Sequence, residues 1–107
     1  MKRILFLCSK NRLRSLTAEA VFSEIDTWEV ASAGISHDAD VRVSAEDIDW
    51  ADIIFVIESV HRNKLNKKFG ALMKNTKVIS LNIPDDFEYM DPQLIEILQQ
   101  KVPKLVD

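Results

Sequence analysis

A thiol and a guanidinium with five residues between them are the groups in this chain best suited to chemistry: Cys8 and Arg14. The apolar run of residues 4–7 precedes them, and an apolar-patterned stretch over residues 16–22 follows. This order predicts a strand, a tight loop and a helix. The start of a helix presents free backbone N–H groups and the positive end of its dipole, so residues 8–15 are expected to bind an anion.

Cys8 is the candidate nucleophile, because the field at a helix N-terminus stabilises a thiolate. Such a thiolate can attack phosphorus and form a covalent phospho-cysteine. Arg14 offers a planar fork of donors that matches phosphate oxygens, where charge develops in the transition state. Ser15 can donate a hydrogen bond to the sulfur. The alternative is that Cys8 is a small buried residue of the core.

The other residues of this loop are expected to bind the anion through backbone N–H groups or side chains. Lys10 and Arg12 add positive charge to a chain whose formal net charge is −3. A local basic site in an acidic protein suits a small anion or a phosphorylated side chain. The expected binding residues are Ser9, Lys10, Asn11, Arg12, Leu13 and Ser15.

Cleavage of a phosphate ester also requires a proton for the leaving oxygen, and aspartates in the last quarter of the chain can supply it. Asp91 precedes Pro92, which is typical of a helix N-cap and the first helical position. Asp85 and Asp86 follow the last predicted strand and remain candidates for the general acid, although aspartates are also common in turns.

Two aromatic residues follow these aspartates in the same predicted loop. Phe87 and Tyr89 can wall a pocket and stack on an aryl phosphate, with plain core packing as the alternative. Glu58 and His61 lie in or beside a strongly charged predicted helix. Both are therefore expected at the solvated surface.

Apolar periodicity predicts strands at residues 4–7, 28–31, 53–57 and 77–81. Helices are expected at about residues 14–26 and after Ser44, Ser59 and Asp91, with Pro103 ending or kinking the last one. This alternation predicts an α/β fold: a three-layer α/β/α sandwich with a four-stranded parallel sheet and the phosphate loop after strand 1. Ligands bind such sheets at the carboxyl ends of the strands, where residues 8–15 lie.

Length and composition indicate one globular domain over residues 1–107. A pI near 5.3 argues against nucleic acid as a partner. The single cysteine excludes an intrachain disulfide and a multi-cysteine zinc site, and it fits a reducing cytoplasm. We find no secretory signal and no apolar stretch of the ~20 residues that a membrane span needs. No metal or cofactor is expected.

The chain resembles the low-molecular-weight protein tyrosine phosphatases and their arsenate reductase relatives. The phosphate loop and first helix carry the most specific part of the resemblance, over residues 4–22. It continues through Ser32-Ala33-Gly34, through residues 44–68 and through the aspartate-bearing loop at residues 83–87. It implies a cytoplasmic hydrolase that removes phosphate from a phosphorylated protein or small aryl phosphate through a phospho-cysteine, and a loop that binds inorganic phosphate or sulfate.

The resemblance also assigns roles to individual residues. It implies that Asp85 is the general acid, with Asp86 next if the alignment shifts by one residue. It implies that Asn11 and Ser32 brace the phosphate loop, where Asn tolerates a left-handed backbone. It places His37 at the rim of the site.

The sequence departs from the family pattern at several positions. The chain is shorter than is usual, and the missing stretch falls between residues 34 and 44. Lys10 stands where Gly is common, and Leu13 stands where a second Cys is common. Leu16 and Asp86 replace prolines. Lys10 and Arg12 make the loop more cationic than expected, which bears on the substrate more than on the chemistry.

Three other functions remain open from the sequence. A cysteine phosphocarrier resembling the cellobiose-type IIB components of sugar phosphotransferase systems has a similar length, but such proteins lack an arginine at the end of the loop. An arsenate reductase generally recycles through additional cysteines, and none follows Cys8. A non-catalytic phosphoprotein-binding module is the third, if the shortened segment removed part of the site.

Overall fold

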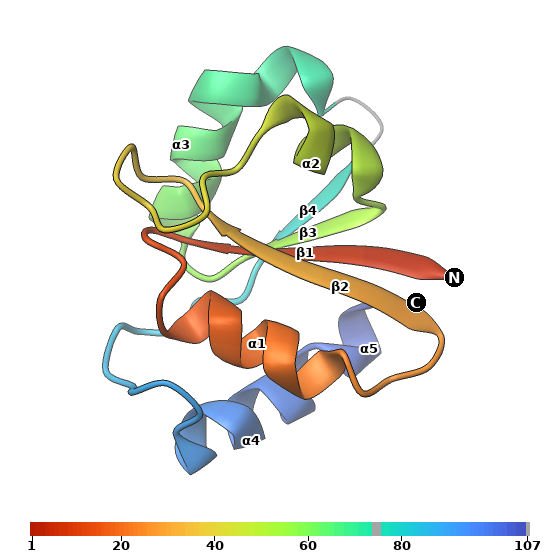
Figure 1. Ribbon diagram of the computed structural model, residues 1–107, viewed down its shortest axis with the longest axis vertical. Helices are drawn as coiled ribbons and strands as arrows, with labels where there is room; N and C mark the ends of the chain where they lie inside the picture. Colours follow the sequence, from red (N-terminus) through yellow and green to blue (C-terminus); the bar gives the residue numbers. More distant parts are fainter. Residues whose placement is uncertain (74–75, 107) are drawn as a thin grey trace.

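Four parallel strands form the centre of the computed structural model, which describes residues 1–73 and 76–106. The strands are β1 (Lys2–Cys8), β2 (Trp28–Gly34), β3 (Ile53–Val56) and β4 (Lys77–Ser80), in the spatial order β2-β1-β3-β4. Helices cover one face with α1 (Arg14–Phe22), α4 (Pro92–Lys101) and α5 (Pro103–Val106), and the other with α2 (Ala45–Trp50) and α3 (Ser59–Phe69) (Figure 1). The predicted three-layer α/β/α sandwich with a four-stranded parallel sheet is confirmed.

Cys8 is the last residue of the central strand β1 and therefore lies at the carboxyl edge of the sheet. β1 pairs with β2 up to Cys8↔Gly34 and with β3 up to Leu7↔Val56. All strands run in the same direction, so their following loops emerge at this one edge. The loop after β1 lies between β1 and α1, as the sequence predicts.

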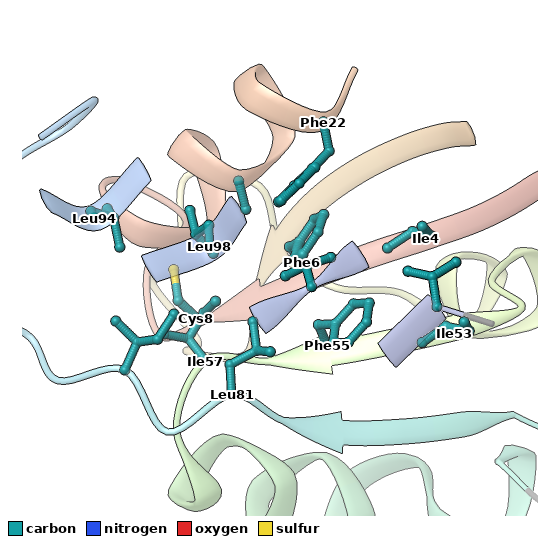
Figure 2. Close-up of a cluster of buried hydrophobic side chains, with 14 residues drawn as sticks. Ile4, Phe6, Cys8, Phe22, Ile53, Phe55, Ile57, Leu81, Leu94 and Leu98 are labelled. Carbon is teal, nitrogen blue, oxygen red and sulfur yellow. The ribbon is translucent and has the colours of Figure 1, made fainter. Parts of the chain in front are cut away.

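Two hydrophobic clusters pack the two faces of the sheet. On the face toward α1 and α4, the ring of Phe6 stacks on Phe22 at 5.7 Å and on Phe55 at 5.5 Å. Because side chains alternate along a strand, Cys8 lies on the same face as Phe6. Figure 2 shows its sulfur at one end of this cluster, so Cys8 belongs to the core and to the site at once.

Helix ends follow the local sequence. Ser44 caps α2 and forms a reciprocal capping box with Asp47. The Asp91 carboxylate accepts a 2.9 Å hydrogen bond from the Gln93 N–H, which confirms the predicted cap at the start of α4. A proline begins α5 directly after α4 has ended. Within residues 1–73 and 76–106, no helix combines the length and the apolarity that crossing a membrane requires.

Some predicted boundaries were wrong. Helix α1 ends at Phe22 rather than near residue 26, and β2 continues to Gly34 rather than ending at residue 31. The N-cap of α3 is Glu58, one residue before the predicted Ser59. These ends depend on tertiary contacts: β2 is prolonged by its pairing with β1, which local propensity does not encode.

We expect Gly34→Ala to destabilise the fold. A Cβ at this position would lie 2.5 Å from Ala39 Cβ and 2.7 Å from the Ser9 carbonyl oxygen. Overpacking of this kind reduces the free energy of unfolding by about 1–3 kcal/mol, measurable by urea denaturation.

Gly70→Ala is the matched control, because nothing lies within 4 Å of the Cβ that alanine would add there, and the φ of −50° is helical. It is expected to leave stability unchanged or raise it by up to ~1 kcal/mol. Equal losses in the two variants would contradict the close approach at Gly34.

Candidate active site

The phosphate loop turns sharply at Asn11, whose φ is +59°. Asn adopts this left-handed conformation more readily than most residues. Its side chain is buried, and its Oδ1 accepts a 2.9 Å hydrogen bond from the Ser15 hydroxyl. This contact joins Asn11 to Ser15 at the other end of the loop.

Two groups contact the sulfur of Cys8. The Asn11 N–H donates to Sγ at 3.3 Å, and the Ser15 Oγ lies 2.9 Å from Sγ. Ser15 has a single proton to donate. With a neutral thiol, the S–H donates to Ser15 and Ser15 donates to Asn11. With a thiolate, the Ser15 hydroxyl turns to the sulfur, so the network accommodates both protonation states.

Arg14 is 5% exposed, and its guanidinium contacts two other segments of the chain. Its Nη1 donates to the Ile83 carbonyl oxygen at 2.8 Å and lies 3.3 Å from Glu58 Oε2. Its Nε lies 3.7 Å from Asp85 Oδ1. A buried guanidinium needs such partners, and they orient its donor fork.

The prediction that His61 is solvated was wrong, whereas Glu58 is 35% exposed and pairs with Arg14. His61 is 1% exposed. Its Nδ1 accepts from the Glu58 N–H at 3.1 Å, and its Nε2 lies 3.6 Å from the carboxylate that contacts Arg14. His61 and Leu65 are four residues apart on one helix face, and this spacing could have revealed the buried side.

A second loop, residues 36–40, flanks the phosphate loop and is attached to it by backbone and side chains. Its N–H groups at Ser36 and Asp40 donate to the carbonyl oxygens of Ser9 and Lys10 at 2.8 and 3.1 Å. Asp38 pairs with Lys10 at 3.2 Å, and Asp40 pairs with Arg12 at 3.1 Å. The sequence analysis missed this role, although two acidic residues in one loop and two cations in another were a usable signal.

One residue that the resemblance assigned to this loop contacts another element instead. The Ser32 hydroxyl donates to Glu19 of α1, so Ser32 does not brace the loop as predicted. The close approach is made at Gly34, where only a hydrogen fits. His37 is exposed in the flanking loop.

The loop after β4, residues 81–91, is tied to the phosphate loop near both of its ends. One tie is the hydrogen bond from Arg14 to the Ile83 carbonyl oxygen. The other is the fully buried Thr17 of α1, whose hydroxyl donates to the Leu13 carbonyl oxygen at 2.7 Å and accepts from the Met90 N–H at 2.9 Å. Sequence reasoning missed Thr17, because its partner lies 73 residues away.

These loops enclose a pocket of about 320 Å³ at the carboxyl edge of the sheet. Asp85 lies in its wall together with the thiol of Cys8 and the guanidinium of Arg14, as the sequence predicts. The lining residues are Cys8, Ser9, Lys10, Arg12, Leu13, Arg14 and Asp85. Asn11 and Ser15 are buried and contact the sulfur instead.

Three residues predicted at the pocket lie outside this lining. Asp86 is exposed. Phe87 packs against the hydrophobic cluster beneath α1 and α4, so its ring does not wall the pocket. Tyr89 is 53% exposed. The backbone turns Phe87 toward the core and Asp85 toward the site, a choice that the sequence leaves open.

No model of a protein family matches the sequence, and no curated protein matches it. Solved structures match over nearly the whole chain. The low molecular weight protein tyrosine phosphatase SP-PTP from Streptococcus pyogenes is 18% identical, covers 100% of this chain and 95% of its own, and has a TM-score of 0.80. The YwlE arginine phosphatase from Geobacillus stearothermophilus is 21% identical, covers 98% and 93%, and has a TM-score of 0.77.

A third match is Vibrio vulnificus Wzb, solved in complex with benzylphosphonate. It is 20% identical, covers 92% of this chain and 90% of its own, and has a TM-score of 0.70. The chain therefore has the fold of the low-molecular-weight protein tyrosine phosphatases, which confirms the predicted fold class.

We expect acid to destabilise the protein through His61. Burial and the charge of Arg14 lower the pKa of His61 from 6.5 to about 4, against the opposing effects of Glu58 and Asp85; Lys64 lowers it too. The unfolded chain binds this proton more readily, so stability is complete above pH 6.5 and falls between pH 6.5 and 4. The shift corresponds to at most about 3 kcal/mol in the free energy of unfolding.

His61→Asn keeps a hydrogen-bond acceptor near the Glu58 N–H and removes the titration. Its free energy of unfolding is expected to vary less between pH 7 and about 4 than that of the wild type. His37→Asn, at an exposed position, is the control. Parallel pH profiles for the wild type and His61→Asn would contradict the assignment.

Proposed function

We propose that this protein is a cysteine-dependent phosphomonoesterase, a protein tyrosine phosphatase that acts through a phospho-cysteine intermediate. One observation carries the proposal: the Cys8 sulfur, contacted by Asn11 N–H and Ser15 Oγ, opens on a pocket whose wall also holds Arg14 and Asp85. The proposed nucleophile, anion-binding group and general acid therefore line the same pocket.

In the first step, the Cys8 thiolate attacks phosphorus while the bond to the leaving oxygen breaks. Arg14 and the loop N–H groups bind the equatorial oxygens, where charge develops. Asp85 gives its proton to the leaving oxygen. Water then attacks the phospho-cysteine, Asp85 accepts the proton of that water, and phosphate leaves with the thiolate restored.

Glu58 is proposed to position Arg14 for this work. The guanidinium is already held from α3 and from the loop after β4 before substrate arrives, so little side-chain freedom remains to be lost on binding. Asp85, in contrast, is 68% exposed and only 3.7 Å from Arg14 Nε. Because the Asp85 side chain is exposed in the pocket wall, its carboxyl group can approach the leaving oxygen of a substrate.

The same geometry disfavours the other functions. A phosphocarrier must keep its phospho-cysteine from water, whereas an aspartate in the wall of the same pocket can promote hydrolysis. An arsenate reductase that recycles through further cysteines has no second thiol here. A binding module needs no acid, and the short segment after β2 still supplies the flanking loop of residues 36–40.

We propose that residues 1–107 work as one domain on phosphorylated proteins or small aryl phosphates, with inorganic phosphate or sulfate as competing anions, and without a metal, cofactor, nucleic acid or membrane. A reducing cytoplasm suits the chemistry, since Cys8 must stay a free thiol. The neighbours named above include both a tyrosine and an arginine phosphatase, so phosphotyrosine and phosphoarginine peptides are compared in the assay.

The test of this function is hydrolysis of p-nitrophenyl phosphate by the wild type and Cys8→Ser at equal concentration. We expect turnover by the wild type and its loss in Cys8→Ser, with the two proteins equally folded in urea denaturation. Iodoacetate should inactivate the wild type, and phosphate should protect it. Turnover retained in Cys8→Ser would refute the proposal.

Asp85→Asn is expected to reduce hydrolysis of a phosphotyrosine peptide more than hydrolysis of p-nitrophenyl phosphate. Nitrophenolate leaves without help, whereas the tyrosine oxygen needs the proton. The measurement is the ratio of kcat for the two substrates. Asp86→Asn is the matched control, since this neighbouring carboxylate lies outside the pocket lining. The leaving-group effect appearing only in Asp86→Asn would move the acid by one residue.

A further inference from the structure

Two cations at the mouth of the pocket have no part in the proposed chemistry. Lys10 and Arg12 line the pocket, and their side chains are 48% and 53% exposed. Arg14, by contrast, is buried and bound to Ile83 and Glu58. The pocket lining thus has one deep guanidinium and two shallow cations, and the proposed chemistry uses only the deep one.

The flanking loop holds these two cations in place. Asp38 contacts Lys10 Nζ at 3.2 Å, and Asp40 accepts from Nε and Nη2 of Arg12 at 3.1 and 3.4 Å. Hydrogen bonds from Ser36 and from Lys10 lower the pKa of Asp38 to about 2, so this carboxylate is ionised at any ordinary pH. The two aspartates therefore restrict where the cationic groups can go.

Lys10 and Arg12 can still bind a further anion while they pair with these aspartates. Asp38 and Asp40 are themselves 63% and 54% exposed, and exposed pairs are weak and screened by salt. Lysine has three donors, and the Asp40 contacts leave the Nη1 donors of Arg12 available. A second anion can share both cations or replace one aspartate.

We propose that the rim formed by Lys10 and Arg12 is a second anion subsite, and that the preferred substrate is a phosphorylated residue with an acidic residue next to it in the polypeptide. This inference rests on the proposed function and names its substrate class. The phosphoryl group enters to Cys8 and Arg14. The neighbouring carboxylate binds at the rim, where it shares Lys10 and Arg12 with the exposed carboxylates of Asp38 and Asp40.

Two phosphotyrosine peptides test the subsite, identical except for glutamate or glutamine on both sides of the phosphotyrosine. Their Kd for the Cys8→Ser variant and their kcat/KM with Cys8 intact are measured. We expect the glutamate peptide to be favoured about threefold to fivefold at low ionic strength, as for exposed charge pairs, and less at about 0.5 M salt.

Variants of the rim identify the source of the preference. Lys10→Gln and Arg12→Gln should each reduce it, and Asp40→Asn should increase it by freeing Arg12. Lys104→Gln removes the same charge from an exposed position of α5 and should change nothing.

Equal binding and turnover of the two peptides, or a preference unaltered in Lys10→Gln and Arg12→Gln, would overturn the subsite and leave the proposed function standing. If neither peptide is hydrolysed and neither binds better than its unphosphorylated form, the proposed function itself fails, and the subsite fails with it.

Discussion

The buried guanidinium of Arg14 is the constraint on which the carboxyl edge of the sheet depends. A charge removed from water is stable only when partners surround it, and those partners come from far along the chain. Glu58 approaches from the start of α3, and Ile83 and Asp85 approach from the loop after β4. The Arg14 side chain thereby connects α1 to the start of α3 and to the loop after β4.

Cys8 shows how core packing and chemistry share one strand. The alternation of β1 places its side chain on the same face as Phe6, at the end of a hydrophobic cluster (Figure 2). The strand ends there, and the next residues turn into the N-terminus of α1. The sulfur therefore rests on a rigid apolar base while polar groups reach it from the loop, which is how a site becomes preorganised.

The cations that line the pocket with Cys8 fall into two groups, one buried and one exposed. The inner cation, Arg14, is buried and oriented by hydrogen bonds and carboxylates. The outer cations, Lys10 and Arg12, are exposed and paired with the flanking loop. Because Arg14 is buried, its contacts are strong and fixed in direction. Because Lys10 and Arg12 are exposed, their ion pairs are weak, and another anion can replace an aspartate. Under the proposed function, Arg14 binds the phosphoryl group, and Lys10 and Arg12 bind a neighbouring negative charge of the substrate.

The sequence by itself determined the features whose causes are local. Periodicity and turn residues predicted the strands, the alternation of helices, the cap at Asp91 and the loop between the first strand and the first helix. These follow from backbone preferences and side-chain patterns within a few residues.

Only the tertiary structure decided which distant residues complete the site. Glu58 and Thr17 acquire their roles from partners in distant segments, Arg14 and Met90, which the fold brings to the edge of the sheet. The inward turn of Phe87 and the close approach at Gly34 were equally hidden. Such contacts depend on packing between segments far apart in the chain, and no local propensity encodes them.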